Sequence, residues 1–263
     1  MNLDLQHKNA LVCGSTQGIG RATAIELAQM GATVTLLARN EAALKTVLGT
    51  LATDHGQQHD YLVADFSQPV QVGQTVQDYL SQTQKIFHIL INNTGGPPGG
   101  PIADATLEAF MAAYQMHLAC NHVLAQAMIP GMKEASFGRI INVISTSVKQ
   151  PINGLGVSNT TRGAVANWSK TLANEIGQFG ITVNNVLPGF TETERLFSII
   201  RNRAEKTGKT EQEVADAMKL TTPAHRFAQP EEVANAIAFL AAPAAGYING
   251  INVPVDGGRT KSL

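Results

Sequence analysis

The sequence predicts one α/β domain built on a doubly wound parallel β-sheet of about seven strands, with helices on both faces. Two observations lead to this prediction. Short apolar runs alternate with longer segments of helical periodicity along the 263 residues, and the short runs are apolar at consecutive positions. Strands buried on both faces show that pattern. No linker, charge run or low-complexity tract divides the chain, so we predict a single domain over residues 1–263.

Each strand candidate is a short, mostly apolar run. The seven candidates are Ala10–Cys13, Thr33–Leu37, Tyr61–Ala64, Ile86–Ile91, Arg139–Ile144, Thr182–Leu187 and Asn252–Val255. The segments between them repeat apolar residues with a helical period. These helix candidates are Ile19–Met30, Glu41–Thr53, Val70–Ser81, Leu107–Ala135, Gly163–Phe179 and Glu231–Ala241. Repeated alternation of strand and helix is typical of a parallel sheet covered on both faces.

Two further segments are expected at the carboxyl edge of the sheet, where ligands bind in open α/β folds. The run Gly95–Pro101, rich in glycine and proline, follows a strand directly and is predicted to be a loop. The stretch Phe190–Phe227 is polar and charged and interrupts the regular alternation. We predict that this stretch is irregular and forms a mobile lid over the same edge.

The composition excludes several classes of function. Charged residues make up 15% of the chain and the formal net charge is −1, so no basic surface is available for nucleic acid or a membrane. No apolar run is long enough to span a bilayer, and the segment from Met1 to Lys8 has no apolar signal region. The two cysteines, Cys13 and Cys120, supply neither a disulfide framework nor a metal-ligand spacing. We therefore predict a cytoplasmic protein without a bound metal.

The turn after the first strand has the composition of a site for nucleotide phosphates. Strand Ala10–Cys13 leads into a glycine-rich turn that opens a helix. Glycine permits a tight turn and a close approach of the backbone to a pyrophosphate, while free N–H groups at the helix start face the anion. We predict a Rossmann-type dinucleotide site here. Its cofactor-binding positions are Gly14, Ser15, Gln17, Gly18, Ile19 and Gly20.

The end of the second strand favours NADP(H) over NAD(H). An acidic residue at this point would accept hydrogen bonds from the ribose diol of NAD, but Ala38 occupies the place. Arg39 follows it and suits the 2′-phosphate of NADP. The alternative is that Arg39 is simply a solvated arginine at a strand end.

Over essentially its whole length the chain resembles the short-chain dehydrogenase/reductase family. Gly14, Gly18 and Gly20 match the family's TGxxxGIG turn, with Cys13 where threonine is usual. Four more matches follow in the family's order. They are Asp65 after the third strand, Asn92-Asn93-Thr94-Gly95 like NNAG, Pro188-Gly189-Phe190-Thr191-Glu192-Thr193 like PG-x-x-x-T, and a tail from Tyr247 to Gly258 like the closing motif.

The resemblance implies roles for these positions. Asp65 is expected to contact the adenine, and the Pro188–Thr193 segment to hold the nicotinamide carboxamide through its backbone and threonines. The further cofactor-binding positions that it implies are Asn92, Gly95, Pro188, Gly189, Thr191 and Thr193. It also implies a homotetramer or homodimer built on the two long helices and the last strand.

The same resemblance places unusual residues at the family's catalytic positions. The family uses Asn, Ser, Tyr and Lys, with the last two spaced as YxxxK on one helix. The serine falls on Ser145, but Ser158 stands at the tyrosine position and Arg162 at the lysine position. His117 stands at the asparagine position. The run Gly163-Ala164-Val165 continues the family's pattern and supports this register.

Ser158 is a poor chemical replacement for a tyrosine. Lowering the pKa of a phenol from about 10 to about 7 requires roughly 4 kcal/mol, whereas an aliphatic hydroxyl near about 15.7 requires roughly 12 kcal/mol. Ser158 is therefore expected to donate a hydrogen bond or to relay a proton through water. Arg162 lies four residues after Ser158, on the same face of the predicted helix, and stays protonated at physiological pH.

Acid/base capacity is expected from one of two other residues. Lys149 lies in the loop after Ser145, where a nearby Arg162 would depress its pKa, and we take it as the candidate general acid. His117 titrates near neutrality without help. A solvated loop lysine and a packed helix histidine are the alternatives for these two residues.

Three functions stay open. The leading one is an NADP(H)-dependent oxidoreductase that reduces a small-molecule carbonyl or oxidises an alcohol, with Ser145 polarising the substrate oxygen and Arg162 holding an acidic group or oxyanion charge. The second is a catalytically silent NADP(H) sensor or assembly subunit. The third uses Lys149 or His117 for elimination or hydrolysis. The lid selects no substrate class, because it carries charges of both signs: Glu192, Glu194, Arg195, Arg201, Arg203, Glu205 and Lys206.

Overall fold

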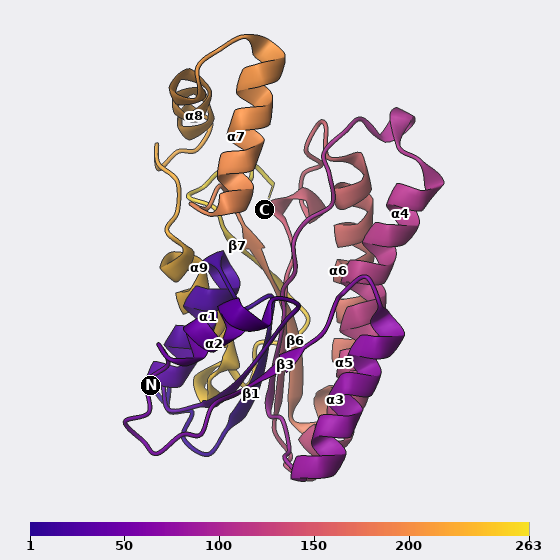
Figure 1. Cartoon of the computed structure of the whole chain (residues 1–263), viewed down its shortest axis with the longest axis vertical. Coiled ribbons are helices and arrows are strands. Elements are labelled where there is room, and N and C mark those ends of the chain that lie inside the picture. Colours follow the sequence, from indigo (N-terminus) through magenta and orange to yellow (C-terminus); the bar gives the residue numbers. More distant parts are fainter. Residues whose placement is uncertain (263) are drawn as a thin grey trace.

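The computed structural model describes residues 1–262. A parallel sheet of seven strands runs through its centre in the order β3-β2-β1-β4-β5-β6-β7 (Figure 1). The strands are β1 (Asn9–Cys13), β2 (Thr33–Ala38), β3 (Asp60–Val63), β4 (Ile89–Asn92), β5 (Gly138–Val143), β6 (Ile181–Pro188) and β7 (Asn252–Val255). The predicted fold class, a single Rossmann-type domain with about seven parallel strands, is confirmed.

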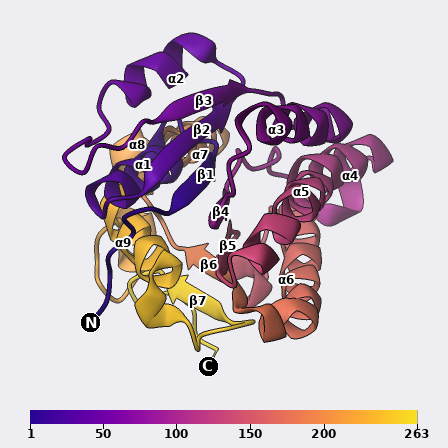
Figure 2. The ribbon, with the colours of Figure 1, turned by 90° about the horizontal axis from the view of Figure 1, so that it is seen from below.

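Helices cover both faces of the sheet, as Figure 2 shows. One layer consists of α1 (Gly18–Gln29), α2 (Glu41–Leu48) and α9 (Pro230–Ala241), and the other of α3 (Pro69–Thr83), α4 (Leu107–Tyr114), α5 (Cys120–Glu134) and α6 (Gly156–Ile176). Neighbouring residues of β1 serve opposite layers, because successive side chains of a strand point to opposite faces. Val12 is fully buried in the core beneath α1 and α9, and Leu11 in the core beneath α3 and α5. Both faces are therefore packed, which explains the continuous apolar runs.

Several helix boundaries differ from the predicted ones. The segment predicted as one helix over Leu107–Ala135 is α4, a π-helical turn η2 (Gln115–Ala119) and α5. The helix predicted from Gly163 begins earlier, at Gly156, and the helix predicted from Glu41 ends at Leu48. The early turns of α6 contain Ser, Asn and Thr, which have weak helix propensity, so packing decides their conformation. The short 3₁₀ turns are η1 (Ile102–Asp104), η3 (Thr146–Val148), η4 (Gly177–Phe179) and η5 (Pro243–Ala245).

The segment 190–227 is not irregular, and that prediction was wrong. It holds two helices, α7 (Glu194–Thr207) and α8 (Glu211–Leu220), which project beyond the carboxyl edge of the sheet (Figure 1). Leu196 and Ile200 on α7 pack with Val214 and Met218 on α8 in a small core of their own. The numerous charged residues of the segment lie mainly on the outer faces and mask the helical period in the sequence. That this segment moves as a lid stays a prediction.

A row of asparagines crosses the carboxyl half of the sheet. Asn92, Asn142, Asn185 and Asn252 are register partners on β4, β5, β6 and β7. Their amides are joined by hydrogen bonds of 2.8 Å, 3.1 Å and 2.8 Å in that order, and Asn142 also donates to Ser169 Oγ at 2.9 Å. A buried polar group needs such partners, because leaving it unpaired costs free energy. The row therefore favours this one strand register.

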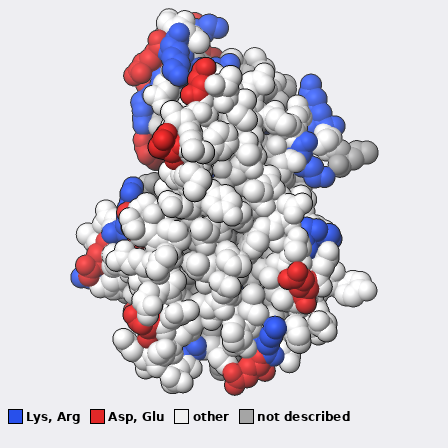
Figure 3. Space-filling view, turned by 90° about the vertical axis from the view of Figure 1, so that its right-hand side faces the viewer, with Lys and Arg blue, Asp and Glu red and all other residues white. Residues whose placement is uncertain are grey.

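The outer surface of α4 is apolar. Leu107, Met111 and Tyr114 are exposed at i, i+4 and i+7, which places them on one side of the helix. Figure 3 shows that charged side chains lie mainly around the edge of this face of the molecule. Contiguous exposed apolar surface of this kind is typical of an interface between proteins.

Candidate functional site

A cleft of about 700 Å³ opens at the carboxyl edge of the sheet, beneath α7. It lies where β1 and β4 are neighbours, and at such a switch point the strand order reverses and ligands bind in open α/β sheets. Most of the predicted site residues line this cleft. They are Gly14, Gln17, Gly18, Ile19, Arg39, Asp65, Gly95, Ser145, Ser158, Arg162, Pro188, Gly189, Thr191 and Thr193.

The turn after β1 has a backbone that only glycine permits. Gly14 has a φ of +58°, and a Cβ there would lie 2.6 Å from the carbonyl oxygen of Asn93. A Cβ at Gly20 would lie 2.2 Å from the carbonyl oxygen of Gly14. The N-terminus of α1 has no side-chain cap and no acidic residue in its first turn, so its N–H groups are available to an anion. The turn therefore fits a pyrophosphate.

The far end of the cleft suits an adenosine 2′-phosphate. Arg39 is exposed at the end of β2, and Ala38 leaves no carboxylate at that strand end. Asp65 follows β3 and accepts a hydrogen bond of 2.9 Å from the backbone N–H of Ser67. That hydrogen bond, with a smaller contribution from Arg39, holds the pKa of Asp65 below its ordinary value. The arrangement leaves Arg39 as the positive group of this end.

Three residues predicted to bind cofactor do not line the cleft. Ser15 is fully buried, and its Oγ has no hydrogen-bond partner in the part of the chain that the structure describes. Gly20 serves the close packing of α1 against the turn. The side chain of Asn92 is 2% exposed and belongs to the asparagine row. The structure therefore gives these three residues packing positions behind the site.

His117 lies in the π-helical turn and is 1% exposed. Its Nε2 has no hydrogen-bond partner among the described residues. Burial, with a smaller contribution from the nearby Arg162 cation, lowers the pKa of His117 to about 2. The expectation that it titrates near neutrality is therefore wrong, because burial leaves the protonated imidazolium without the water that would stabilise its charge.

Ser145 is oriented by the turn that follows β5. Its Oγ accepts a hydrogen bond of 3.1 Å from the N–H of Ser147, which leaves its hydroxyl proton available to a ligand in the cleft. Lys149 is half-buried at the end of η3 and does not line the cleft. The structure thus places Ser145 and Ser158 in the same cleft, whereas Lys149 does not line it.

Arg162 is a buried cation. Its Nη1 donates a hydrogen bond of 3.0 Å to the carbonyl oxygen of Val143, and the residue is only 8% exposed. Burial, and to a lesser degree the charge of Arg195, lowers the pKa of Arg162 to about 10, so the guanidinium remains charged at neutral pH. Ser158 lies one turn earlier on α6.

Arg195 is the site residue that sequence analysis missed. It was counted there only among the charges of the lid. The structure places it in the first turn of α7, where its Nη2 donates a hydrogen bond of 2.6 Å to the carbonyl oxygen of Pro97 and its side chain lines the cleft. The only signal in the sequence is its position two residues after Thr193, at the end of the PG-x-x-x-T segment.

A family model described as enoyl-(acyl carrier protein) reductase matches residues 14–260. The chain belongs to the short-chain dehydrogenase/reductase family. It is thus an oxidoreductase by descent, and its seven-stranded fold is the one that its structural neighbours share.

Several known proteins align with nearly the whole length of this short-chain dehydrogenase/reductase. The 3-oxoacyl-[acyl-carrier-protein] reductase FabG of Pseudomonas aeruginosa is 31% identical over 99% of the chain and 100% of its own length. The NADPH-dependent reductase BacG of Bacillus subtilis is 28% identical over 98% of the chain and 100% of its own length. The structure of L-sorbose reductase from Gluconobacter frateurii, complexed with NADPH and L-sorbose, matches with a TM-score of 0.93 and 30% identity over 100% of both chains.

Neither a tyrosine nor a lysine lines the cleft of this short-chain dehydrogenase/reductase, as far as residues 1–262 show. Its four tyrosines, Tyr61, Tyr79, Tyr114 and Tyr247, all lie elsewhere. The ionisable side chains that do line the cleft are Arg39, Asp65, Arg162 and Arg195. Among the described residues, the cleft therefore has hydroxyl donors and guanidinium cations beside Ser145, but no phenol or amine.

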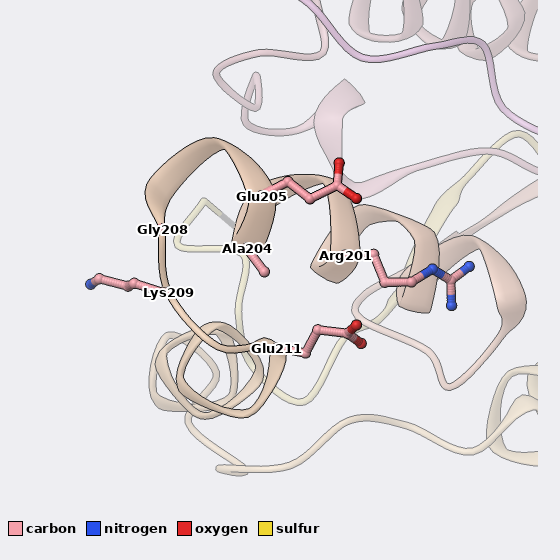
Figure 4. Close-up of a pocket in the computed structure, with 6 residues that line it drawn as sticks. All are labelled: Arg201, Ala204, Glu205, Gly208, Lys209 and Glu211. Atoms are coloured by element: carbon pink, nitrogen blue, oxygen red, sulfur yellow. The ribbon is translucent and has the colours of Figure 1, made fainter.

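A second depression, of about 450 Å³, lies where α7 turns into α8 (Figure 4). Arg201 and Lys209 there are matched by Glu205 and Glu211, so the depression has no dominant charge. No three His, Cys, Asp or Glu side chains are placed to hold a metal ion in the described part of the chain. Within the same residues, no helix combines the length and apolar character of a membrane span.

Proposed function

We propose that this chain is an NADP(H)-dependent oxidoreductase that reduces a carbonyl group or oxidises an alcohol with an atypical proton donor. One observation carries the proposal: the cleft joins a phosphate-binding turn and Arg39 at one end to Ser145, Ser158 and Arg162 at the other. BacG, named as NADPH-dependent, and the L-sorbose reductase, complexed with NADPH, support the choice of cofactor.

The residues present fit this dinucleotide. The glycine turn and the uncapped start of α1 would hold the pyrophosphate, and Arg39 the 2′-phosphate. Asp65 would contact the adenine, and Thr191 and Thr193 the carboxamide, as the family resemblance implies. When bound, NADPH supplies the hydride for reduction.

Two serines and one cation act on the substrate oxygen. The hydroxyl groups of Ser145 and Ser158 donate hydrogen bonds to the carbonyl oxygen and polarise it. The Arg162 guanidinium stabilises the negative charge that develops on this oxygen, and the low dielectric of its buried position strengthens the interaction. Arg162 keeps its own proton, because its pKa stays well above neutral pH.

The proton must reach the substrate oxygen without a tyrosine. We propose that Ser158, which stands at the family's tyrosine position, relays a proton from solvent through its hydroxyl group. Lys149, four residues after Ser145, is the alternative source. The two routes differ in which residue is needed for turnover, and the variants described in the Discussion separate them.

A catalytically silent NADP(H)-binding protein is the second candidate function. The cleft without a tyrosine or a lysine favours it, while the intact phosphate turn is common to both functions. A silent sensor or assembly subunit binds NADPH but converts no carbonyl compound into an alcohol.

Calorimetric titration with NADPH and, separately, with NADH tests the proposed function. We expect tight binding of NADPH and weaker binding of NADH. A panel of carbonyl compounds is then screened for oxidation of NADPH. Failure of both nucleotides to bind would overturn the proposal, and binding without turnover on any compound would favour the silent protein.

A further inference from the structure

Two arginines, Arg162, which is buried, and Arg195, which is exposed, line the same cleft as Ser145 and Ser158. Arg162 enters it from α6 and Arg195 from α7, and both line the space beside Ser145 and Ser158. They are close enough that the charge of Arg195 lowers the pKa of Arg162. The two like charges repel each other, and because Arg162 is buried this repulsion costs free energy unless an anion lies near both.

Within residues 1–262, no carboxylate forms an ion pair with either arginine. The four ion pairs of the described residues involve neither arginine. The two acidic neighbours of Arg195 are used elsewhere, since Glu194 pairs with Arg201 and Glu192 accepts a hydrogen bond of 2.8 Å from Gln229. Among residues 1–262, Asp65 is the one acidic residue that lines the cleft, and it lies near Arg39.

The hydrogen bonds of the two arginines leave donors free. Each guanidinium donates one hydrogen bond to a backbone carbonyl, Arg162 to Val143 and Arg195 to Pro97. A guanidinium has five N–H donors in a planar fork that matches a carboxylate. The backbone contacts hold both side chains in place, and the remaining N–H groups are available to a ligand.

Part of the cleft wall is apolar. Leu155, Phe190, Leu196 and Ile199 line the same cleft. A small polyol would leave this surface in contact with water, whereas an aliphatic or aromatic body would bury it. The combination of apolar wall and unpaired cations selects a molecule with one apolar part and one anionic part.

We propose that the substrate is a carbonyl compound that carries a carboxylate on an apolar body, and that Arg195, with Arg162, binds the carboxylate. Arg195 acts as the specificity-determining residue, because it belongs to the segment that covers the cleft. This inference rests on the proposed function and names the substrate class for the same site.

A phosphate of the cofactor is the other anion that can neutralise these two cations, and the experiment separates a cofactor phosphate from a substrate carboxylate. Binding of NADP⁺ is measured first by calorimetry on the wild-type chain, and this step alone judges the proposed function. The saturated complex, which has no hydride to transfer to a ketone, is then titrated with 2-oxo acids from pyruvate to phenylpyruvate and with their methyl esters. Acid and ester differ in charge and share the apolar body.

We expect the acids to bind about 10- to 100-fold more tightly than their esters, the range for one charge-assisted contact. Arg195→Met is expected to remove most of this difference, and Arg195→Lys to keep part of it. Arg201→Met is the matched control on α7, because Arg201 pairs with Glu194 outside the cleft. Arg195→Met and Arg201→Met are both expected to leave the affinity for NADP⁺ unchanged.

Equal binding of acids and esters across the panel would overturn the proposal. So would an Arg195→Met chain that loses affinity for NADP⁺ while its preference for acids stays as in the wild type, since the cation would then serve the cofactor. If NADP⁺ fails to bind, the same acid and ester titrations of the free protein still decide whether this cleft selects a carboxylate.

Discussion

The side-chain amide of Asn92 donates a 2.8 Å hydrogen bond to the amide oxygen of Asn142, its register partner on the neighbouring strand. The amide nitrogen of Asn142 in turn donates hydrogen bonds to Asn185 Oδ1 and Ser169 Oγ. The row lies directly behind the strand ends that carry the cleft. It therefore couples the register of β4, β5 and β6 to the position of the loops that form the site.

Replacing Asn142 with alanine is expected to destabilise the fold strongly. The side chain is fully buried, and its loss removes the acceptor to which the amide nitrogens of Asn92 and Asn121 donate. Each unpaired buried group costs about 1 to 3 kcal/mol, so we expect a loss of about 3 kcal/mol in the free energy of unfolding. Urea denaturation measures it, with the exposed Asn167→Ala as control. A change as small as that of the control would contradict a structural role for the row.

His117 makes the stability of the fold depend on pH. Its pKa is lowered from 6.5 to about 2 in the folded chain, so below pH 6.5 the unfolded chain binds a proton that the folded chain does not. This contribution to stability is complete above pH 6.5 and is lost as the pH falls. We expect a loss of about 2 kcal/mol between pH 6.5 and about 5.

The variant His117→Asn tests this pH dependence, because asparagine does not titrate. Urea denaturation at a series of pH values is expected to show a flatter profile for His117→Asn than for the wild type. His225→Asn, at an exposed position, serves as the control and is expected to keep the wild-type slope. Parallel profiles for all three chains would show that His117 is not the source.

Arg39 is expected to set the preference between the two nicotinamide cofactors. It stands at the end of the cleft opposite the serines and is exposed there. Arg39→Ala is expected to weaken NADPH binding by about 10- to 100-fold, the range for a charge-assisted hydrogen bond, and to leave NADH binding unchanged. Calorimetry measures both, and Arg203→Ala on α7 controls for loss of a positive charge. An equal effect on both nucleotides would assign Arg39 to another role.

Turnover is expected to need Ser158 more than Lys149. Removing a group that takes part in proton transfer costs about 100-fold or more in rate, so Ser158→Ala is expected to lower kcat by about that factor while NADPH binding stays intact. Lys149→Met is expected to retain turnover, because this lysine does not line the cleft. Steady-state kinetics on a substrate found in the panel measures both. A loss of about 100-fold or more in the kcat of Lys149→Met would instead identify Lys149 as the proton donor.

The exposed stripe of α4 is expected to form part of a homodimer or homotetramer interface. Met111 lies between Leu107 and Tyr114 on this stripe, and the surrounding face carries few charges (Figure 3). Met111→Glu places an uncompensated charge in the interface and is expected to shift the mass towards the monomer. Light scattering after gel filtration measures the mass. Leu220→Glu introduces the same charge at an exposed apolar position on α8 and is expected to leave the assembly unchanged.

Local pattern was enough for much of the fold. Val12 and its neighbours are apolar on consecutive positions because both faces of the sheet are covered, and this is visible without a structure. The helices of segment 190–227 were not predicted, because charged residues on their outer faces hide the period of Leu196 and Ile200. The same limit applies to the π-helical turn at His117, which interrupts a segment of continuous helical periodicity.

The predictions of a phosphate turn and of a preference for NADP(H) depend on residues that are neighbours in the chain, such as Gly14, Gly18 and Ala38-Arg39. The sequence by itself was therefore enough to predict a nucleotide site and to show the family resemblance. Only the tertiary structure decided that Arg195 on α7 lines the same cleft as Arg162 on α6, that His117 is buried and neutral, and that four asparagines share one row. The physical reason is that charge, burial and hydrogen-bond partners depend on residues distant in the chain, which are brought together only when the sheet and α7 have packed.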